Sequence, residues 1–108
     1  MSSINYRKDR LNCQQARKQI AIIMLEHPSK VHFTRHALEE MGFDKVTTVD
    51  VLNILKSSSS KIYDQGELEK GSYRYRLETN NYIIVIAFQP DGKTLVVVTA
   101  WDKRKGGQ

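Results

Sequence analysis

The fold is decided by a stretch in the second half of the chain, residues 72–101, which reads SYRYRLETNNYIIVIAFQPDGKTLVVVTAW. Three of its segments are rich in β-branched and aromatic residues, the side chains that favour β-strands. The Asn-Asn pair that ends at Asn81 suits a two-residue hairpin, and the Gln-Pro-Asp-Gly sequence that ends at Gly92 is typical of a turn. We therefore predict an antiparallel meander of three strands, to which residues 61–64 could add a fourth. The three strands are expected at residues 72–79, 82–88 and 94–101.

The two turns also predict which side chains share a face of the sheet. If Thr79 pairs with Tyr82, and Phe88 with Lys93, the alternation of side chains along each strand gives one face that is entirely apolar. A slip of one residue in either hairpin would reverse this assignment. The residues expected on the apolar face are Tyr75, Leu77, Ile84, Ile86, Leu95, Val97 and also Thr99.

The first half of the chain begins with a predicted amphipathic helix over residues 12–27. Pro28 ends this helix, because the residue before a proline disfavours the helical conformation. We expect the apolar stripe to be covered by the domain itself rather than by a partner, since a long exposed stripe would promote aggregation. Residues 1–10 are polar and are expected to fray. The stripe consists of Cys13, Ala16, Ile20, Ile23, Met24 and His27.

Two shorter helices are predicted next. Thr34 is a suitable N-cap for the first of them, and Gly42 is its natural C-terminal stop. The second begins at Thr47 or directly after it, where Thr47-x-x-Asp50 resembles a capping box. The serine run at residues 57–60 ends it.

These elements predict an α+β fold, with N-terminal helices packed on one face of a three- or four-stranded antiparallel sheet. With 108 residues, of which 40% are hydrophobic and 27% are charged, the chain has room for one globular domain, residues 1–108. Within it, residues 12–27 form the first helix, and residues 103–108 are expected to be a basic, flexible tail.

The sequence also bears on the compartment. The longest apolar runs, residues 20–25 and 82–88, are far shorter than the ~20 residues that span a bilayer. The first residues lack the apolar stretch of a signal peptide. A lone cysteine, Cys13, excludes an internal disulfide and fits a reducing compartment. We expect a cytoplasmic protein with no membrane partner.

The net charge of +5 is placed unevenly along the chain. Residues 1–36 hold seven Lys or Arg against two acids, whereas residues 37–108 hold ten of each. Such polarity favours a polyanion or an acidic protein as the partner, although a basic surface can also serve solubility alone.

Arg74 and Arg76 are the most informative polar pair. Alternate positions on a strand place both side chains on one face, about 7 Å apart, close enough to hold one phosphate group. The strand register puts them on the face opposite the apolar one, beside small or apolar neighbours. The alternative is that two arginines cover an exposed sheet face without any ligand.

His36 is the second candidate. On the predicted helix it points away from the apolar side and lies one turn before Glu40, an i,i+4 partner. Histidine is the side chain best suited to move protons near neutral pH, but a surface histidine paired with a glutamate has the same appearance.

Neither a metal ion nor an organic cofactor is expected. His27 and His32 do not combine with His36 into any metal-binding spacing, and the sequence has no C-x-x-C pattern or glycine-rich nucleotide loop. Cys13 is interpreted as a small helix residue rather than a nucleophile.

The stretch FTRHALEEM, residues 33–41, contains a Thr-Arg-His-Ala-x-x-x-Met motif at a helix start. It is followed by a second helix, a Tyr-Arg-Tyr-Arg strand and a closing Val-Val-Val-Thr strand. In motif and element order, residues 30–102 resemble a group of small bacterial domains related to the RelE-like and MqsR-like toxins. This group lies within the superfamily that also contains barnase-type nucleases.

The resemblance implies a helical layer on a curved antiparallel sheet, with RNA bound on the open face. Similar toxins cut RNA without a metal ion, commonly on the ribosome, and are held inactive by an antitoxin. His36 matches the histidine at the helix start, Arg74 and Arg76 match basic strand residues, and Thr99 matches a polar position in the closing strand. The register derived above puts Thr99 on the apolar face, which conflicts with that last match.

We therefore expect an endoribonuclease that works by transesterification. His36, tuned by Glu40, would take the proton from a ribose 2′-OH, and Arg74 and Arg76 would stabilise the charge on the phosphate. Two alternatives remain: a non-catalytic RNA- or DNA-binding protein, and a protein-interaction module such as an immunity-like partner. Sequence-independent attraction of the RNA backbone is expected from Lys30, Arg35, Lys103, Arg104 and Lys105.

Overall fold

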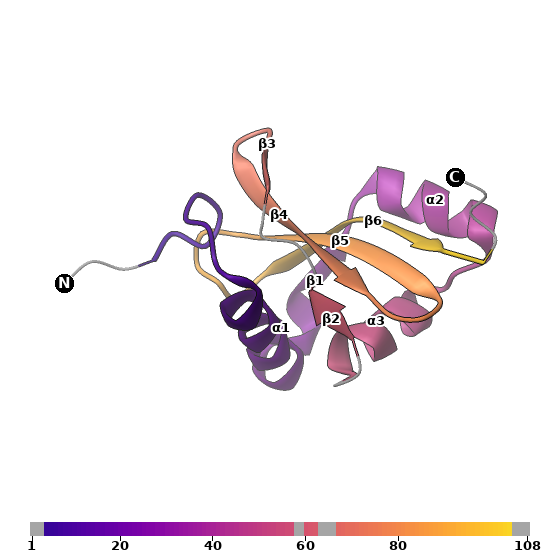
Figure 1. Ribbon diagram of the computed structural model, residues 1–108, viewed down its shortest axis with the longest axis horizontal. Coiled ribbons are helices and arrows are strands. Elements are labelled where there is room, and N and C mark those ends of the chain that lie inside the picture. The colour runs from indigo at the N-terminus through magenta and orange to yellow at the C-terminus, as the bar shows by residue number, and fades with distance from the viewer. Residues whose placement is uncertain (1–3, 58–59, 63–66, 105–108) are drawn as a thin grey trace.

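The computed structural model describes residues 4–57, 60–62 and 67–104, and it confirms the α+β fold class. Figure 1 shows α1 and α3 on one side of a twisted sheet, with α2 beside β6. The helices are α1 (Cys13–Glu26), α2 (Arg35–Asp44) and α3 (Thr48–Lys56), with a 3₁₀ turn, η1 (Pro28–Lys30). The strands are β1 (Val31–Phe33), β2 (Lys61–Ile62), β3 (Glu67–Glu69), β4 (Ser72–Glu78), β5 (Tyr82–Phe88) and β6 (Leu95–Asp102). None of the described helices is long and apolar enough to cross a membrane.

The sheet contains the predicted meander of β4, β5 and β6, but it is larger than expected and mixed. Its strands follow the order β1-β6-β5-β4-β2, and β3 also pairs with β4. The expectation of a purely antiparallel sheet is wrong, because β1 runs parallel to β6, with Val31 opposite Leu95. β3 exists because Lys70 and Gly71 both adopt positive φ angles, 53° and 83°, which close a two-residue hairpin.

The helix starts follow the capping signals in the sequence. Thr47 and Asp50 form the predicted capping box at α3, and the Thr34 hydroxyl accepts a hydrogen bond from the Ala37 N–H at α2. The predicted stop of α2 at Gly42 is wrong, since the helix continues to Asp44.

Instead, α2 ends at Lys45, which adopts the left-handed conformation with φ 58°. The Lys45 N–H donates to the Gly42 carbonyl, and the N–H of buried Val46 donates to the Met41 carbonyl. These two hydrogen bonds satisfy carbonyls that the end of the helix leaves free, so a glycine is not required at the stop.

One hydrophobic core lies between the helices and the sheet, and the predicted apolar face of the sheet forms its floor. Tyr75, Leu77, Ile84, Ile86, Leu95 and Val97 are each at most 1% exposed. The stripe of α1 is covered by the domain itself, as expected. From the helices, the core receives Ala16, Ile20, Ile23, Met24, Ala37, Met41, Val51 and Leu55.

The β5–β6 hairpin has a different register from the expected one. Phe88 pairs with Leu95 rather than with Lys93, a shift of two residues that keeps the apolar face intact because side chains alternate with a period of two. A bulge then interrupts the ladder, so that Thr99 pairs with Val85 while Val98 has no partner on β5. The expected position of Thr99 on the apolar face is therefore wrong.

The N-terminal segment is not frayed from residue 4 onward. The Tyr73 N–H donates to the Arg7 carbonyl at 2.9 Å, and the Leu11 N–H donates to the Tyr75 hydroxyl at 2.9 Å. Gly92 has φ 71°, and a Cβ atom there would lie 2.5 Å from the ring of Tyr6, so glycine is required at this turn.

Candidate functional site

The sheet face turned away from the core, here called the open face, brings together three of the predicted site residues. Arg76 on β4 pairs with Val85 on β5, and Val85 pairs with Thr99 on β6. Arg76 and Thr99 therefore lie in one row across the sheet. Arg74 pairs with Ala87, which pairs with Val96, in a second row. The bulge at Val98 is what places Thr99 in line with Arg76. The open face carries Arg74, Arg76, Glu78, Ile83, Val85, Ala87, Val96, Val98, Thr99 and Trp101.

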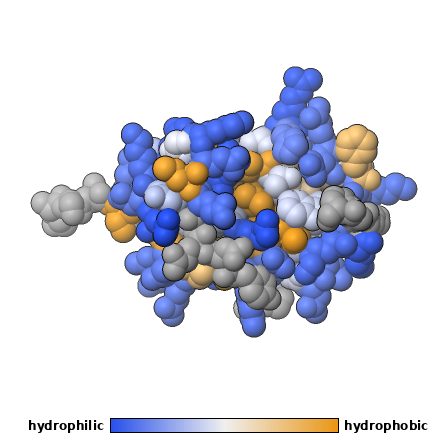
Figure 2. Space-filling view, turned by 45° about the horizontal axis from the view of Figure 1, so that its top comes forward, coloured by the Kyte–Doolittle hydropathy of each residue, from blue (hydrophilic) through white to orange (hydrophobic). Residues whose placement is uncertain are grey.

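The surface has both polar and apolar parts. Figure 2, which tilts the upper side of Figure 1 toward the viewer, shows hydrophilic side chains surrounding smaller apolar patches. Ile83, Val85, Val96 and Trp101 on the open face are only partly exposed. A charged ligand on this face would therefore lie beside apolar neighbours, where water screens charge less effectively.

A hollow of about 160 Å³ lies at one end of the open face, beside Arg74. Its apolar lining consists of Ala87, Phe88, Val96 and Val98. Its polar lining consists of Arg7, Thr34, Ser72, Arg74 and Gln89. Two arginines thus border the hollow together with Ser72 and Gln89, and arginine, hydroxyl and amide groups are those that proteins use to bind phosphate.

Arg74 is the more buried of the two strand arginines. Its side chain is 21% exposed, and its Nη1 lies 3.5 Å from Oε2 of Glu69 on β3. Its Nε is buried and has no hydrogen-bond partner among the described residues. A buried donor without a partner costs free energy, so the neighbours of Arg74 in the described chain do not fully satisfy its guanidinium group. Arg76 is exposed and makes no ion pair within the described chain.

His36 forms the predicted pair with Glu40, with Nε2 3.3 Å from Oε1. Its side chain is 64% exposed. However, it lines a different depression from Arg74, together with Phe43 and Asp44. Thr34 is the N-cap of α2, the helix that carries His36, and it also lines the hollow beside Arg74. Its hydroxyl donates a hydrogen bond to the Val98 carbonyl at 3.0 Å.

The other predicted RNA contacts are scattered. Lys30 is exposed at the end of η1, away from the residues that line the hollow. Arg35 is exposed on α2, with Nε 3.9 Å from Glu39. Lys103 places its ammonium group 3.4 Å from Glu78 and donates its backbone N–H to the Asn81 carbonyl.

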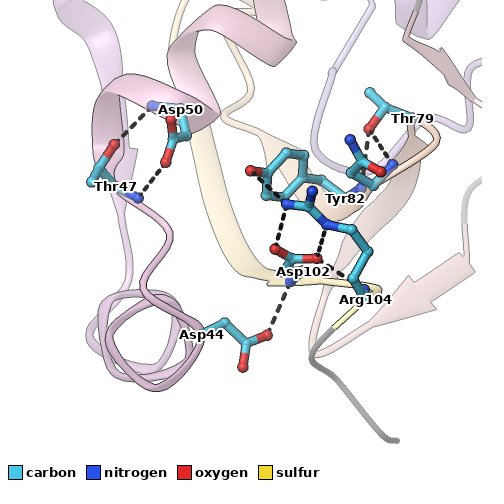
Figure 3. Close-up of polar contacts among 8 residues, drawn as sticks. Asp44, Thr47, Asp50, Thr79, Tyr82, Asp102 and Arg104 are labelled. Atoms are coloured by element: carbon cyan, nitrogen blue, oxygen red, sulfur yellow. Dashed lines mark hydrogen bonds and ion pairs between the residues drawn. The ribbon is translucent and has the colours of Figure 1, made fainter.

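Arg104 closes the end of the sheet (Figure 3). Its Nε and Nη2 donate to Asp102 at 3.0 and 2.8 Å, and its guanidinium carbon lies 5.6 Å from the centre of the Tyr82 ring. The hydrogen bond to Asp102 raises the pKa of Arg104. The expected flexible tail therefore cannot begin at residue 103, since Lys103 and Arg104 are both tied to the sheet. Residues 105–108, including Lys105, lie outside the described residues.

Asp102 is the acidic group that sequence reasoning missed. It is 2% exposed, and its backbone N–H donates to Oδ2 of Asp44 on α2 at 2.9 Å (Figure 3). The signal in the sequence was its position as the last strand residue before three basic residues. Arg7 in the hollow was missed as well, because only tertiary contacts bring the N-terminal segment to the open face.

Among the described residues, no group of three or more His, Cys, Asp or Glu side chains could hold a metal ion. Cys13 is half-buried at the start of α1 and packs against the core. A metal-binding role for the histidines therefore receives no support from the geometry of the described chain.

Fold and surface together define the class: a small α+β domain whose mixed sheet carries arginines on its open face. The chain belongs to the family described as Domain of unknown function (DUF4258), whose profile matches residues 33–102, more than half of the chain. The matched region begins at the last residue of β1 and ends with β6, so α1 lies outside it. No curated protein matches the chain.

Proposed function

We propose that this protein is a metal-independent endoribonuclease of the toxin–antitoxin type, which binds RNA on the open face of its sheet. The observation that carries the proposal is the hollow on the open face, which Arg74 lines together with a second basic residue, Arg7. Such a site suits a phosphodiester, which offers several acceptor oxygens and a negative charge.

The spacing of the two arginines on β4 supports a bound RNA strand rather than a single small anion. Arg74 and Arg76 lie on successive outward positions of β4, so one phosphate at Arg74 leaves room for a second contact at Arg76. Partly exposed apolar residues, among them Trp101, provide surface against which bases can pack.

The chemistry we propose is transesterification. The ribose 2′ oxygen loses its proton to a base and forms a bond to phosphorus, the bond from phosphorus to the 5′ oxygen breaks, and that oxygen takes a proton from water. The products are a 2′,3′-cyclic phosphate and a 5′-hydroxyl. Arg74 and Arg76 stabilise the charge that develops on the phosphate oxygens. His36, paired with Glu40, is the base that the family resemblance implies.

The resemblance also carries the proposal of partners. The RNA is proposed to be cytoplasmic and ribosome-associated, and an acidic antitoxin is proposed to cover the open face. An acidic segment there would neutralise Arg7, Arg74 and Arg76 and would exclude RNA by occupying the same donors.

A second candidate is an RNA-binding protein without catalysis. It is favoured by one observation, namely that His36 and Arg74 line separate hollows. In that case the open face would hold RNA but would have no proton carrier from α2 beside the phosphate.

The test uses purified protein, free of any antitoxin, with naked RNA and with ribosome-bound RNA. We expect cleavage that persists in EDTA, products with 2′,3′-cyclic phosphates, and rates lowered on the order of 10²–10³-fold in Arg74→Ala and in Arg76→Ala. Lys56→Gln, on the exposed end of α3, is the matched control and should cleave like the wild type. Wild-type protein that binds RNA but leaves both substrates intact would eliminate the ribonuclease and leave the binding protein.

A further inference from the structure

His32 lies on β1 between two apolar residues, but its side chain belongs to the open face of the sheet. β1 is three residues long, and its two outer residues, Val31 and Phe33, pack against the hydrophobic core. Because successive side chains of a strand point to opposite faces, His32 between them points to the open face. It is exposed there, in agreement with this alternation.

The pairing of the strands places His32 in the same row as Arg74. His32 pairs with Val96, Val96 with Ala87, and Ala87 with Arg74. The two backbones are therefore separated by three interstrand spacings of ~4.8 Å each, or about 14 Å. The two residues between them in this row, Val96 and Ala87, are small or apolar.

This row passes the hollow that we propose for a phosphate. Val96 and Ala87 both line the hollow, together with Arg74. A phosphodiester held there by Arg74 would thus have the guanidinium group on one side and the imidazole of His32 on the side of β1. His36 lies on α2 and lines the depression with Phe43 and Asp44, and it has no place in this row of the sheet.

The surroundings of the two histidines also differ. His36 is 3.3 Å from the carboxylate of Glu40. His32 makes no ion pair and no side-chain hydrogen bond within the part of the chain that the structure describes. Its imidazole is therefore free to exchange a proton with a ligand, as a general base must.

We propose that His32, in place of His36, is the catalytic base that takes the 2′-OH proton of RNA bound on the open face; this inference rests on the ribonuclease function proposed above. The neutral imidazole accepts the proton while the 2′ oxygen bonds to phosphorus and the bond to the 5′ oxygen breaks. Water protonates the leaving 5′ oxygen, and the imidazolium returns its proton to water. Arg74 holds the phosphate during these steps.

The experiment compares wild type, His32→Ala, His32→Gln and His36→Ala, with Lys56→Gln as the control for an unrelated surface change. Cleavage is measured at saturating RNA. Affinity is measured separately with an RNA whose 2′-OH groups are replaced by hydrogen, which binds but cannot react. Thermal unfolding of each variant shows whether it is folded.

We expect both His32 variants to lose cleavage by ~10²–10⁴-fold while keeping wild-type affinity and unfolding temperature. Added imidazole should restore part of the cleavage in His32→Ala, a rescue that a structural role would not produce. Wild-type cleavage in both His32 variants would overturn the inference and leave the ribonuclease function standing. A wild-type protein that does not cleave would overturn both.

Discussion

Arg74 and Arg76 lie two residues apart on the same strand face, but their surroundings differ. Arg74 is largely buried and is held by Glu69, whereas Arg76 is exposed. A guanidinium group that is already positioned loses little conformational entropy when it binds a phosphate, so Arg74 is the better anchor. Arg76 can adjust to the ligand. At the level of single residues, Arg74 is thus the positioned contact of the site and Arg76 the exposed one.

Tyr75 links the N-terminal segment to the sheet and gives a prediction for stability. Its buried hydroxyl accepts the Leu11 N–H at 2.9 Å. Tyr75→Phe leaves this donor unpaired, so the free energy of unfolding should fall by about 1–3 kcal/mol. Urea denaturation at neutral pH measures the change, and an unchanged midpoint would mean that the segment does not depend on this hydrogen bond.

The same residue predicts how stability depends on pH. Burial raises the pKa of Tyr75 above its ordinary value of 10.0. Because its pKa is higher in the folded state, Tyr75 loses its proton more readily in the unfolded chain. Its contribution to the free energy of unfolding is therefore present below about pH 10 and is lost as the pH rises through the folded pKa. Tyr75→Phe should therefore lose less stability than the wild type between neutral pH and alkaline conditions.

Arg104 is predicted to act on stability as well as on any RNA contact. Removing it in Arg104→Ala leaves the buried carboxylate of Asp102 without its two charge-assisted hydrogen bonds. We expect a lower unfolding temperature, and partial recovery when Asp102→Asn is added, because the second change removes the buried negative charge that Arg104 had neutralised. Equal unfolding temperatures for Arg104→Ala and wild type would contradict the structural role of this pair.

At the scale of elements, two short features determine the composition of the open face. The bulge at Val98 places Thr99 on the open face. The parallel strand β1 adds His32 next to Val96, at the edge of the sheet. Neither changes the core, since Leu95 and Val97 remain buried. Bulges often re-aim side chains in this way next to functional sites.

The position of α1 bears on whether the family region can fold without it. It lies outside the matched residues 33–102, yet Ile20 and Ile23 are fully buried in the common core. Ile20→Ala should lower the free energy of unfolding by about 2–5 kcal/mol, because the large side chain would be replaced by a cavity.

Deletion of residues 1–28 is the stronger version of this test. It would expose the side of the core that α1 covers, so we expect an aggregated or unfolded product. Size-exclusion chromatography and thermal denaturation measure the outcome. A monodisperse product that unfolds cooperatively would show that the family region folds without α1.

At the scale of the whole molecule, RNA binding should depend on salt in proportion to the phosphates contacted. For single strands the slope of log K against log salt is about −0.7 per contact, so three contacts from Arg7, Arg74 and Arg76 give roughly −2. The double variant Arg74→Ala/Arg76→Ala should reduce the magnitude of the slope by about 1.4. Titration at several salt concentrations measures it, and an unchanged slope would place the RNA on another surface.

The features that could be predicted from the sequence are local. Alternation along residues 72–101 and the turn residues predicted the meander and its buried face, and the caps at Thr34 and Thr47 predicted two helix starts. These features depend on neighbours in the chain, whose steric and hydrogen-bonding preferences are the same in any fold. Arg74 and Arg76 could be placed on the open face for the same reason.

The remaining features depend on contacts that form only in the folded chain. The parallel pairing of β1 joins residues more than 60 positions apart, and no local signal specifies which distant edge a three-residue strand will join. The bulge at Val98 likewise reflects packing across β5 and β6, and the hollow forms where Arg7 meets the sheet. These features arise from contacts distant in sequence, whose free energy depends on the packed whole, so the surroundings of Arg74 and His32 could be known only from the folded chain.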